Sequence, residues 1–479
     1  MLPPLIRRRR RHAEPRSKER GFTMALVAMS IVMIISMAAL SIDIGTLYEA
    51  KTEAQRAADA AALTAARVVS ISGATGSNGT NWVQICGGAT STATQAATSM
   101  AQNQQNFIGG IAAGTVTVKY GAGSAGATNT SCNGIADFAV NPVVTVTVQR
   151  TNLPVFFARI FSLFGSRYTG TTVSATATAE AFNPSGSNPM VPVNPRCVKP
   201  WMVPNQDPGN AAKPFVNETT GALQNAGVAT AGVIGETFSL VDDCNASARR
   251  GRTPRTCAVS NAPQATPGAN PTLDYLPGQV LSAPIAIAAN GGIGACSDAT
   301  NNDYSEAVAG CDQTTAYQCG VIGGSNPNMV NLAEDPGPSR NDSVNGAECL
   351  INAGGDGLGN GQDSLNPGAS PYSYPFQIQA GSGSPQVALG NVPNGSQITS
   401  SPSIVSLPIY DSAAVTNFNV GGTTVVTVIG FLQVFINSAN STNGEINVTV
   451  MNVAGCGNNA SSSPVTGTSP VPIRLITPP

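Results

Sequence analysis

Residues 21–67 read GFTMALVAMSIVMIISMAALSIDIGTLYEAKTEAQRAADAAALTAAR. The first part, Phe22 to Ile42, has 21 residues and no charged side chain. As a helix rising about 1.5 Å per residue it spans about 31 Å, which matches the hydrocarbon core of a bilayer. The second part, Tyr48 to Val69, has no Gly or Pro and is rich in Ala, the strongest helix former. The stretch therefore predicts one continuous helix from about residue 22 to about residue 69, whose first half crosses a membrane.

The charges on either side of the apolar run predict its orientation. Residues 1–20 contain eight basic and two acidic side chains, and Asp43 follows the run. The positive-inside rule then places a basic tail, residues 1–21, in the cytoplasm and everything after Asp43 outside. A cleaved signal peptide is the competing interpretation, but its apolar core is usually about 7–15 residues long. We expect a single-pass protein of the bacterial inner membrane with its bulk extracytoplasmic.

The helical extension, residues 43–70, has a stripe of small residues. Its members recur every four positions and so share one helix face: Ala50, Ala54, Ala58, Ala62 and Ala66. Two interpretations stay open. The stripe is a helix–helix assembly surface, for example in a homo-oligomer, or it packs on the chain's own first domain. Glu53, Arg56 and Asp59 form two i,i+3 charge pairs on another face.

This stretch resembles the N-terminal segment of Tad-type (Flp, tight-adherence) pilus-assembly proteins of the TadE/TadG-like group. The matching features are the basic end, the apolar helix and the element QRAADAAAL at residues 55–63. The residues that the resemblance marks for the membrane exit and helix assembly are Asp43, Gly45, Tyr48, Gln55, Ala58, Asp59, Ala62 and Leu63. The resemblance implies an envelope-anchored component of pilus assembly or surface attachment. The implied partners are the membrane and other pilus-assembly or envelope proteins.

A second resemblance concerns the start of the same helix. Residues 20–23, RGFT, are similar to the processing site of type IV prepilins, where cleavage follows Gly21. The fifth residue after that cut is usually Glu in this group, and here it is Leu26. A minor pseudopilin processed after Gly21 is therefore an alternative.

The composition describes the remainder of the chain. Of all residues, 10% are charged and 5% aromatic, with 51 Gly and 34 Pro, which favours strands joined by many turns. Beyond residue 20 there are 16 basic and 24 acidic side chains. Phosphate binding requires clustered Lys and Arg, so we expect no nucleic-acid partner.

We predict an α+β fold with three extracytoplasmic parts. A small α+β module covers residues 71–183, with a helix at 94–107 and alternating strands at 115–120, 144–148 and 173–181. Residues 154–165 have an amphipathic pattern, read as a helix on the sheet or, alternatively, at the membrane interface. A Pro-rich linker follows at 184–215. A β-rich, disulfide-bearing region covers 216–479, with strands predicted at 238–241, 285–289, 404–409, 425–436 (bent at Gly430) and 445–453.

The cysteines indicate an oxidising compartment. They are even in number, widely spaced and free of C-x-x-C pairs, which favours disulfides over a zinc site. They are Cys86, Cys132, Cys197, Cys244, Cys257, Cys296, Cys311, Cys319, Cys349 and Cys456. Cys86 with Cys132 is the favoured pair, because both lie in the predicted module.

We expect no enzymatic activity. The single histidine, His12, lies in the cytoplasmic tail, which excludes a Ser-His-Asp triad and histidine metal ligands outside the membrane. The one cofactor worth naming is calcium, with oxygen ligands at Asp298, Asn301, Asp303 and Glu306. Ordinary turn chemistry explains the same residues. A surface adhesin or binding module on the same anchor is the alternative function.

Overall fold

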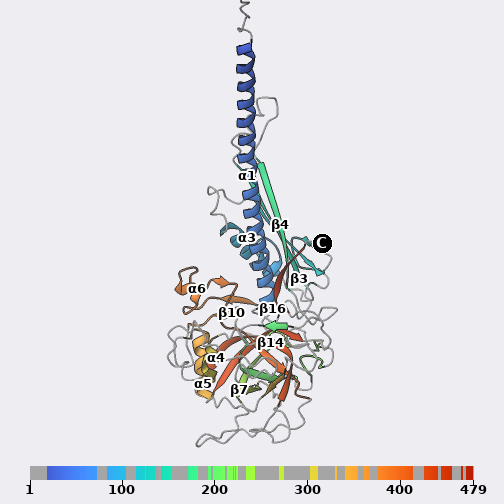
Figure 1. The fold of residues 1–479 in the computed structure, drawn as a ribbon. Coiled ribbons are helices and arrows are strands. Elements are labelled where there is room, and N and C mark those ends of the chain that lie inside the picture. Colours follow the sequence, from blue (N-terminus) through green and yellow to red (C-terminus); the bar gives the residue numbers. More distant parts are fainter. Residues whose placement is uncertain are drawn as a thin grey trace, which may run out of the picture.

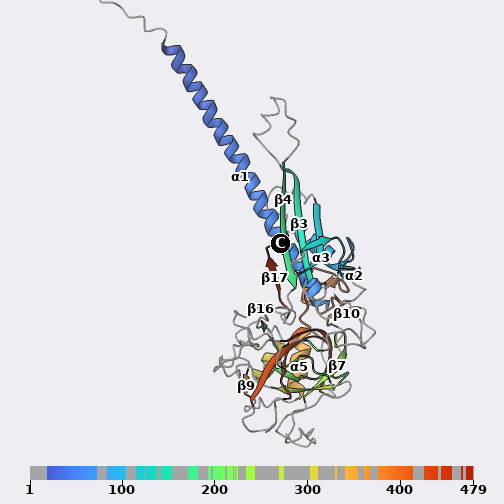
Figure 2. The same cartoon turned by 90° about the vertical axis from the view of Figure 1, so that its right-hand side faces the viewer.

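The computed structural model describes residues 19–72, 83–103, 115–123, 126–135, 138, 142–153, 171–181, 193–195, 198–210, 213–218, 221, 223–224, 233–242, 269–274, 303–310, 329–331, 340–353, 361–366, 376–413, 425–440, 444–455, 465–467 and 471–477. These residues form a long helix, a sheet module beside its second half and a barrel beyond its end (Figures 1 and 2). The predicted α+β class, with a long apolar N-terminal helix, is confirmed.

The long helix, α1, covers Glu19–Ile71 and has 53 residues, so it is about 80 Å long. It is unbroken, as the sequence predicts. Figures 1 and 2 show its first half standing free of the body and its second half lying along strands β3 and β4. The helix therefore joins the predicted membrane span to the far end of the module.

The module is a five-stranded sheet with helices packed on one face. The strand order is β17-β4-β3-β1-β2, with antiparallel neighbours throughout. The strands are β1 (Thr115–Ala122), β2 (Ala127–Asn129), β3 (Pro142–Leu153), β4 (Thr171–Ala181) and β17 (Ile473–Ile476). Helices α2 (Val83–Cys86) and α3 (Thr92–Asn103) complete the module with α1. The three strands predicted here are present, and the predicted helix at 94–107 corresponds to α3.

The C-terminal strand was not expected in this sheet. β17 pairs with the end of β4, from Ile473 opposite Ala181 to Ile476 opposite Thr178. The C-terminus consequently lies beside the module in Figure 1, although the long strands that precede it along the chain belong to the barrel. The barrel is thus an insertion between two neighbouring strands of the module sheet.

The barrel closes through six strands. Its ring order is β13-β6-β8-β7-β15-β14, and β14 pairs again with β13. The strands are β6 (Trp201–Pro204), β7 (Thr237–Asp242), β8 (Ala269–Asp274), β13 (Ile404–Tyr410), β14 (Val425–Asn440) and β15 (Glu445–Gly455), and β9 (Met329–Asn331) extends the sheet from β14. Strand β6 falls within residues 184–215, the range predicted as a linker, and its Trp201, Met202 and Val203 are buried.

The barrel is filled by apolar side chains of its strands. Leu407, Leu432, Val434, Val448 and Phe238 are among its fully or almost fully buried side chains. Strand β14 carries an extra residue at the predicted bend, because Ile409 pairs with Gly430 but Tyr410 pairs with Val428. A Cβ at Gly430 would lie 2.8 Å from the carbonyl oxygen of Ala454, so only glycine fits this close approach.

Smaller elements surround the barrel. They are the helices α4 (Asp303–Ala309), α5 (Arg340–Leu350) and α6 (Pro385–Ala388), the sheet of β10 (Ser364–Asn366), β11 (Gln377–Gln379) and β12 (Gln397–Ile398), and the parallel pair β5 (Val193–Pro195) and β16 (Val465–Gly467). The predicted helix at 154–165 and the predicted strand at 285–289 lie outside the described residues.

Candidate functional site: the long helix and its two junctions

The first half of α1 presents apolar side chains to its surroundings. Phe22, Met33 and Ile42 are 72%, 66% and 52% exposed, and their apolar neighbours along this half are similar. Within the described residues this is the one helix long and apolar enough to cross a membrane. Such a bare apolar surface is costly in water and favourable in lipid. These residues form the candidate membrane anchor.

At the predicted membrane exit, one face of α1 becomes buried while the opposite face stays exposed. Ala39, Asp43 and Ala50 are buried, with Asp43 only 2% exposed. Ile44 and Tyr48, one turn apart, are 58% and 75% exposed on the other side. Tyr is enriched where lipid meets water, because its ring is apolar and its hydroxyl polar. The exit therefore has one face covered by the protein and one face open, with Tyr48 on the open face. A Cβ at Gly45 would touch nothing within 4 Å, so packing does not explain the glycine.

The alanine stripe packs within the chain. Fully buried alanines of α1 contact the inward residues of β3 and β4 and a second alanine stripe on α3. They are Ala54, Ala57, Ala58, Ala61, Ala62, Ala65 and Ala66. Leu63 is partly buried against the same cluster. Of the two interpretations, packing on the chain's own domain is the one observed. The module sheet and α3 cover the stripe within one chain, and a homo-oligomer through this helix stays a prediction.

A buried ion pair joins α1 to the sheet. The Glu53 Oε2 atom lies 2.7 Å from Arg150 Nη1, and Arg150 is 1% exposed. The expected pairing of Glu53 with Arg56 is therefore wrong, since Glu53 points to β3 and Arg56 is exposed. Arg150 follows Val144, Val146 and Val148 on the inward face of β3. In the sequence, the only sign of this contact is that charged Arg150 occupies the same alternate positions as the buried valines.

Two side chains of α1 cover one edge of the sheet. Lys51 Nζ donates to the Ser174 carbonyl, and Gln55 Nε2 donates to the Thr176 carbonyl at 3.2 Å. These acceptors are alternate residues of β4, as expected for carbonyls that point out of one edge. Gln55 also donates to Asp59 Oδ1 at 2.8 Å, which joins two of the predicted motif residues. Open strand edges invite pairing with other chains, and polar side chains suppress it. Gln55 and Asp59 thus have a definite structural role.

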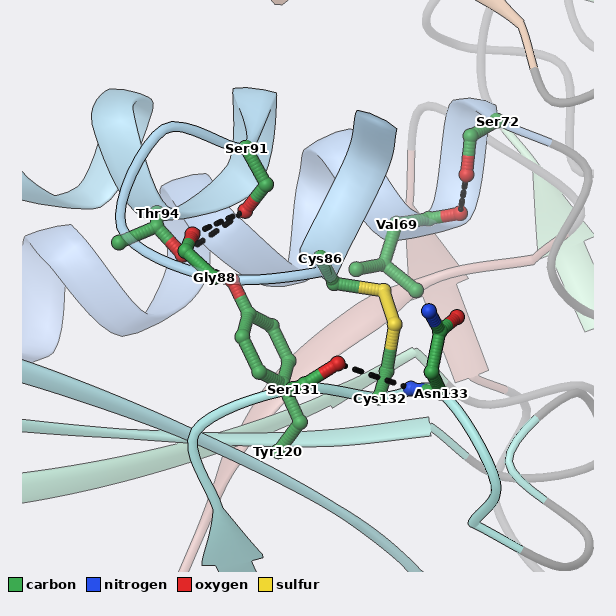
Figure 3. Close-up of a disulfide and its surroundings, with 10 residues drawn as sticks. All are labelled: Val69, Ser72, Cys86, Gly88, Ser91, Thr94, Tyr120, Ser131, Cys132 and Asn133. Carbon is green, nitrogen blue, oxygen red and sulfur yellow. Dashed lines mark hydrogen bonds between the residues drawn. A yellow bond between two sulfur atoms is a disulfide. The ribbon is translucent and has the colours of Figure 1, made fainter. Parts of the chain in front are cut away.

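The predicted disulfide between Cys86 and Cys132 is confirmed. Figure 3 shows that it ties α2 to the loop after β2, beside the ring of Tyr120. The Cys132 amide also donates to the Cys86 carbonyl at 3.0 Å. The Tyr120 hydroxyl bonds Thr94 Oγ1 at 2.8 Å, which links β1 to α3. Burial raises the pKa of Tyr120, so this hydroxyl stays protonated. The disulfide is buried in the module core together with Ile85, Tyr120 and Phe138.

The far end of α1 enters the barrel region. Ile71 belongs to the barrel core. The Asn452 side chain, on β15, donates to the Ser70 carbonyl and to Gln433 Oε1 of β14, the latter at 2.8 Å. The Ser70 hydroxyl donates to the Val471 carbonyl at 3.0 Å. Ser70, Gln433 and Asn452 are fully buried. The sequence correctly predicts that the helix ends near residue 70, but it does not predict these partners.

The barrel contains buried titratable groups away from α1. Burial lowers the pKa of Lys199 to about 7, and its ammonium group donates to the carbonyls of Val308, at 2.8 Å, and Gly310 at the end of α4. Burial and a hydrogen bond with Asp207 raise the pKa of Glu236 to about 8. Lys199 satisfies carbonyls that a helix end leaves open. Each of these groups therefore has a structural partner within the barrel region.

The remaining predicted site residues have little structural description. Asp298 and Asn301 lie outside the described residues, and Asp303 and Glu306 are described only as backbone of α4. Among described residues, no group of three or more His, Cys, Asp or Glu side chains could hold a metal. Cys349 is disulfide-bonded. Outside the described residues lie Cys197, Cys244, Cys257, Cys296, Cys311, Cys319 and Cys456.

Comparison with known families identifies the helix. Residues 21–68 match the Tad family model, described as putative Flp pilus-assembly TadE/G-like. The match ends two residues before the Ser70 contact with the barrel. No curated protein and no solved structure matches the chain. The N-terminal segment is therefore TadE/G-like, as its sequence predicts.

Proposed function

We propose that this protein is a non-enzymatic, membrane-anchored component of a Tad/Flp-type pilus-assembly apparatus. Its N-terminus is cytoplasmic, and its module and barrel lie outside the inner membrane. The TadE/G-like match over residues 21–68 supports the apparatus. The eight basic residues before the apolar run support the orientation.

The observation that carries this proposal is the continuity of α1. One unbroken helix begins in the apolar segment and ends in the barrel core at Ile71. From Asp43 to Ile71 it rises about 42 Å. The buried contacts along this length fix the module on the helix and the barrel on its end. This continuity supports the proposal that the protein holds the barrel at a set height above the membrane, which is a positioning role.

The first test is fractionation of native cells together with the intact mass of the protein. A full-length chain in the inner membrane supports the anchor. A chain beginning at Phe22 would favour a processed pseudopilin. A soluble chain beginning near Leu40 would refute the anchor.

The second test concerns the apparatus. Cells lacking the protein should lose pili while still making the pilin subunit, and the anchored wild-type chain should restore them. A matched variant replaces residues 22–42 with a cleavable signal peptide and should fail to restore pili. If pili form normally without the protein, while surface attachment is lost, the adhesin alternative is favoured.

A further inference from the structure

Two acidic side chains meet at one end of the barrel. Asp207 lies in the turn that follows β6, and Glu236 directly precedes β7. They are 2% and 7% exposed, and their carboxyl groups are hydrogen-bonded to each other. Such a bond needs a proton on one of the two groups, because an ionised carboxylate is only an acceptor. The pair therefore shares one proton.

The surroundings place this proton on Glu236. The Asp207 Oδ1 atom accepts from the backbone amides of Gly209, at 2.8 Å, and Asn210, at 3.2 Å. Hydrogen bonds from amides favour the ionised form of a carboxyl group. Burial, together with the hydrogen bond and the charge of Asp207, raises the pKa of Glu236 to about 8. Glu236 consequently donates and Asp207 accepts.

The turn fits closely over the Glu236 side chain. A Cβ at Gly209 would lie 2.8 Å from the Glu236 Cδ atom and closer still to Oε1, so only glycine allows this approach. The turn is closed by its own backbone, since the Asp207 amide donates to the Lys213 carbonyl at 3.0 Å and the Lys213 amide to the Asn210 carbonyl at 2.8 Å. It is thus a preformed unit that rests on one carboxyl group.

The pair lies beside the place where the barrel receives α1. The Val450 amide of β15 donates to the Glu236 carbonyl at 2.9 Å, and the Gly235 amide donates to the Val450 carbonyl at 2.8 Å. Further along the same strand, Asn452 donates to the Ser70 carbonyl of α1. The turn therefore rests on the barrel end next to the helix junction.

We propose that Asp207 and Glu236 form a pH-dependent latch, which holds the turn at residues 207–210 closed on the barrel while they share a proton and loosens it when that proton is lost. Two buried carboxylates at this separation repel each other strongly. Because Glu236 holds its proton more tightly in the closed turn, with a pKa of about 8 against an ordinary 4.5, closure is strongest below about pH 4.5 and weakens as the pH rises to about 8. This device is additional to the anchoring role and does not depend on it.

The other charged groups of this region have different positions. Lys213 is exposed at the end of the turn. Glu218 accepts a hydrogen bond from a neighbouring amide side chain at 3.0 Å. The one titratable side chain of β15, Glu445, lies at the other end of the β15–β7 pairing. Among the described residues, Asp207 is therefore the charged group that faces Glu236.

The test is hydrogen exchange of the full-length protein in detergent between pH 5 and pH 9, with labelling times scaled to the intrinsic exchange rate at each pH. The amides of Asn210 and Lys213 report closure of the turn. In the wild type their protection should fall about tenfold per pH unit up to about pH 8 and then level off, because opening releases one proton. In Glu236→Gln, which keeps a donor for Asp207 but does not titrate, protection should stay constant.

The matched control is Glu218→Gln, which removes a carboxyl group nearby and should keep the wild-type slope. Asp207→Asn is a second variant that removes the repulsion, so its protection should fall less with pH. Amides of β3 and β4 should stay protected throughout, since the opening is local. The latch is refuted if wild-type protection of the turn does not change with pH, if Glu236→Gln shows the same fall, or if the module loses protection together with the turn.

Discussion

Removing one partner of the Glu53–Arg150 pair should strongly destabilise the module. In Glu53→Ala the Arg150 guanidinium stays buried, while its only hydrogen bond found among the described residues, 2.7 Å long, is lost. Its Nε and Nη2 atoms already have no partner there. Stripping a buried charge of its counter-ion costs about 3–5 kcal/mol.

The assay is native-state hydrogen exchange of the full-length protein in detergent, read at the amides of β3 and β4. Because about 1.4 kcal/mol is a factor of ten, protection of these amides should fall roughly a hundredfold to a few thousandfold. The matched control is Glu180→Ala, which removes the half-exposed Arg474 pair and should cost less than about 1 kcal/mol.

The double variant Glu53→Leu with Arg150→Met separates charge from packing. Apolar replacement of a buried pair is often neutral or stabilising, so protection should return to within about tenfold of the wild type. If Glu53→Ala is as mild as the control, or if the double variant is as damaging as the single one, the ion pair is not what joins α1 to β3.

Three further predictions concern packing, the disulfide and pH. Ala61→Leu should lower the free energy of unfolding by about 1–3 kcal/mol, because Ala61 is fully buried. The control Ala60→Leu, at a half-buried position, should lower it less, and equal effects would contradict the packing of the stripe. Replacing Cys86 and Cys132 with Ser should cost about 2–4 kcal/mol for the lost cross-link over a separation of 46 residues, and unchanged β1 exchange protection would argue against it. The raised pKa of Glu236, about 8 against an ordinary 4.5, means that its stabilising effect is complete below about pH 4.5 and lost as the pH rises through 8. Unfolding midpoints of the barrel at pH 5 to 8 should therefore fall in the wild type and stay flatter in Glu236→Gln, and identical slopes would refute the shift.

Periodicity predicted the elements of this fold well and their partners poorly. Alternation located β1, β3 and β4, and a long apolar, β-branched run located β14. The four residues of β17 are too few to show a pattern, so the return of the C-terminus to the module could not be foreseen. Barrel closure likewise depends on which strands meet, as in the pairing of β13 with both β6 and β14.

In the candidate site, too, the sequence predicted the elements but not the residues that they contact. Spacing placed the alanines on one face of α1 but left open what covers that face. Glu53 had a plausible partner one turn away in Arg56, and sequence spacing favoured this local pair. The structure prefers Arg150, which is 97 residues away. Burial decides between them, because a carboxylate turned toward the sheet is desolvated and needs a counter-ion there.

The contacts of α1 also explain why a recognisable sequence pattern can be confined to the helix. Lys51 and Gln55 bond to backbone carbonyls of β4, which any residue supplies. The alanines demand only small or β-branched neighbours that permit close approach, such as Val146 and Ala177. These interactions constrain the helix tightly and the sheet loosely. The buried Glu53–Arg150 pair is the exception within the matched segment, and at Ser70, just beyond the end of the match at residue 68, the contacts again involve specific side chains, Asn452 and Gln433. A common anchor can thus carry an outer region of very different sequence, provided that its sheet offers one open edge and a shallow apolar face to the helix.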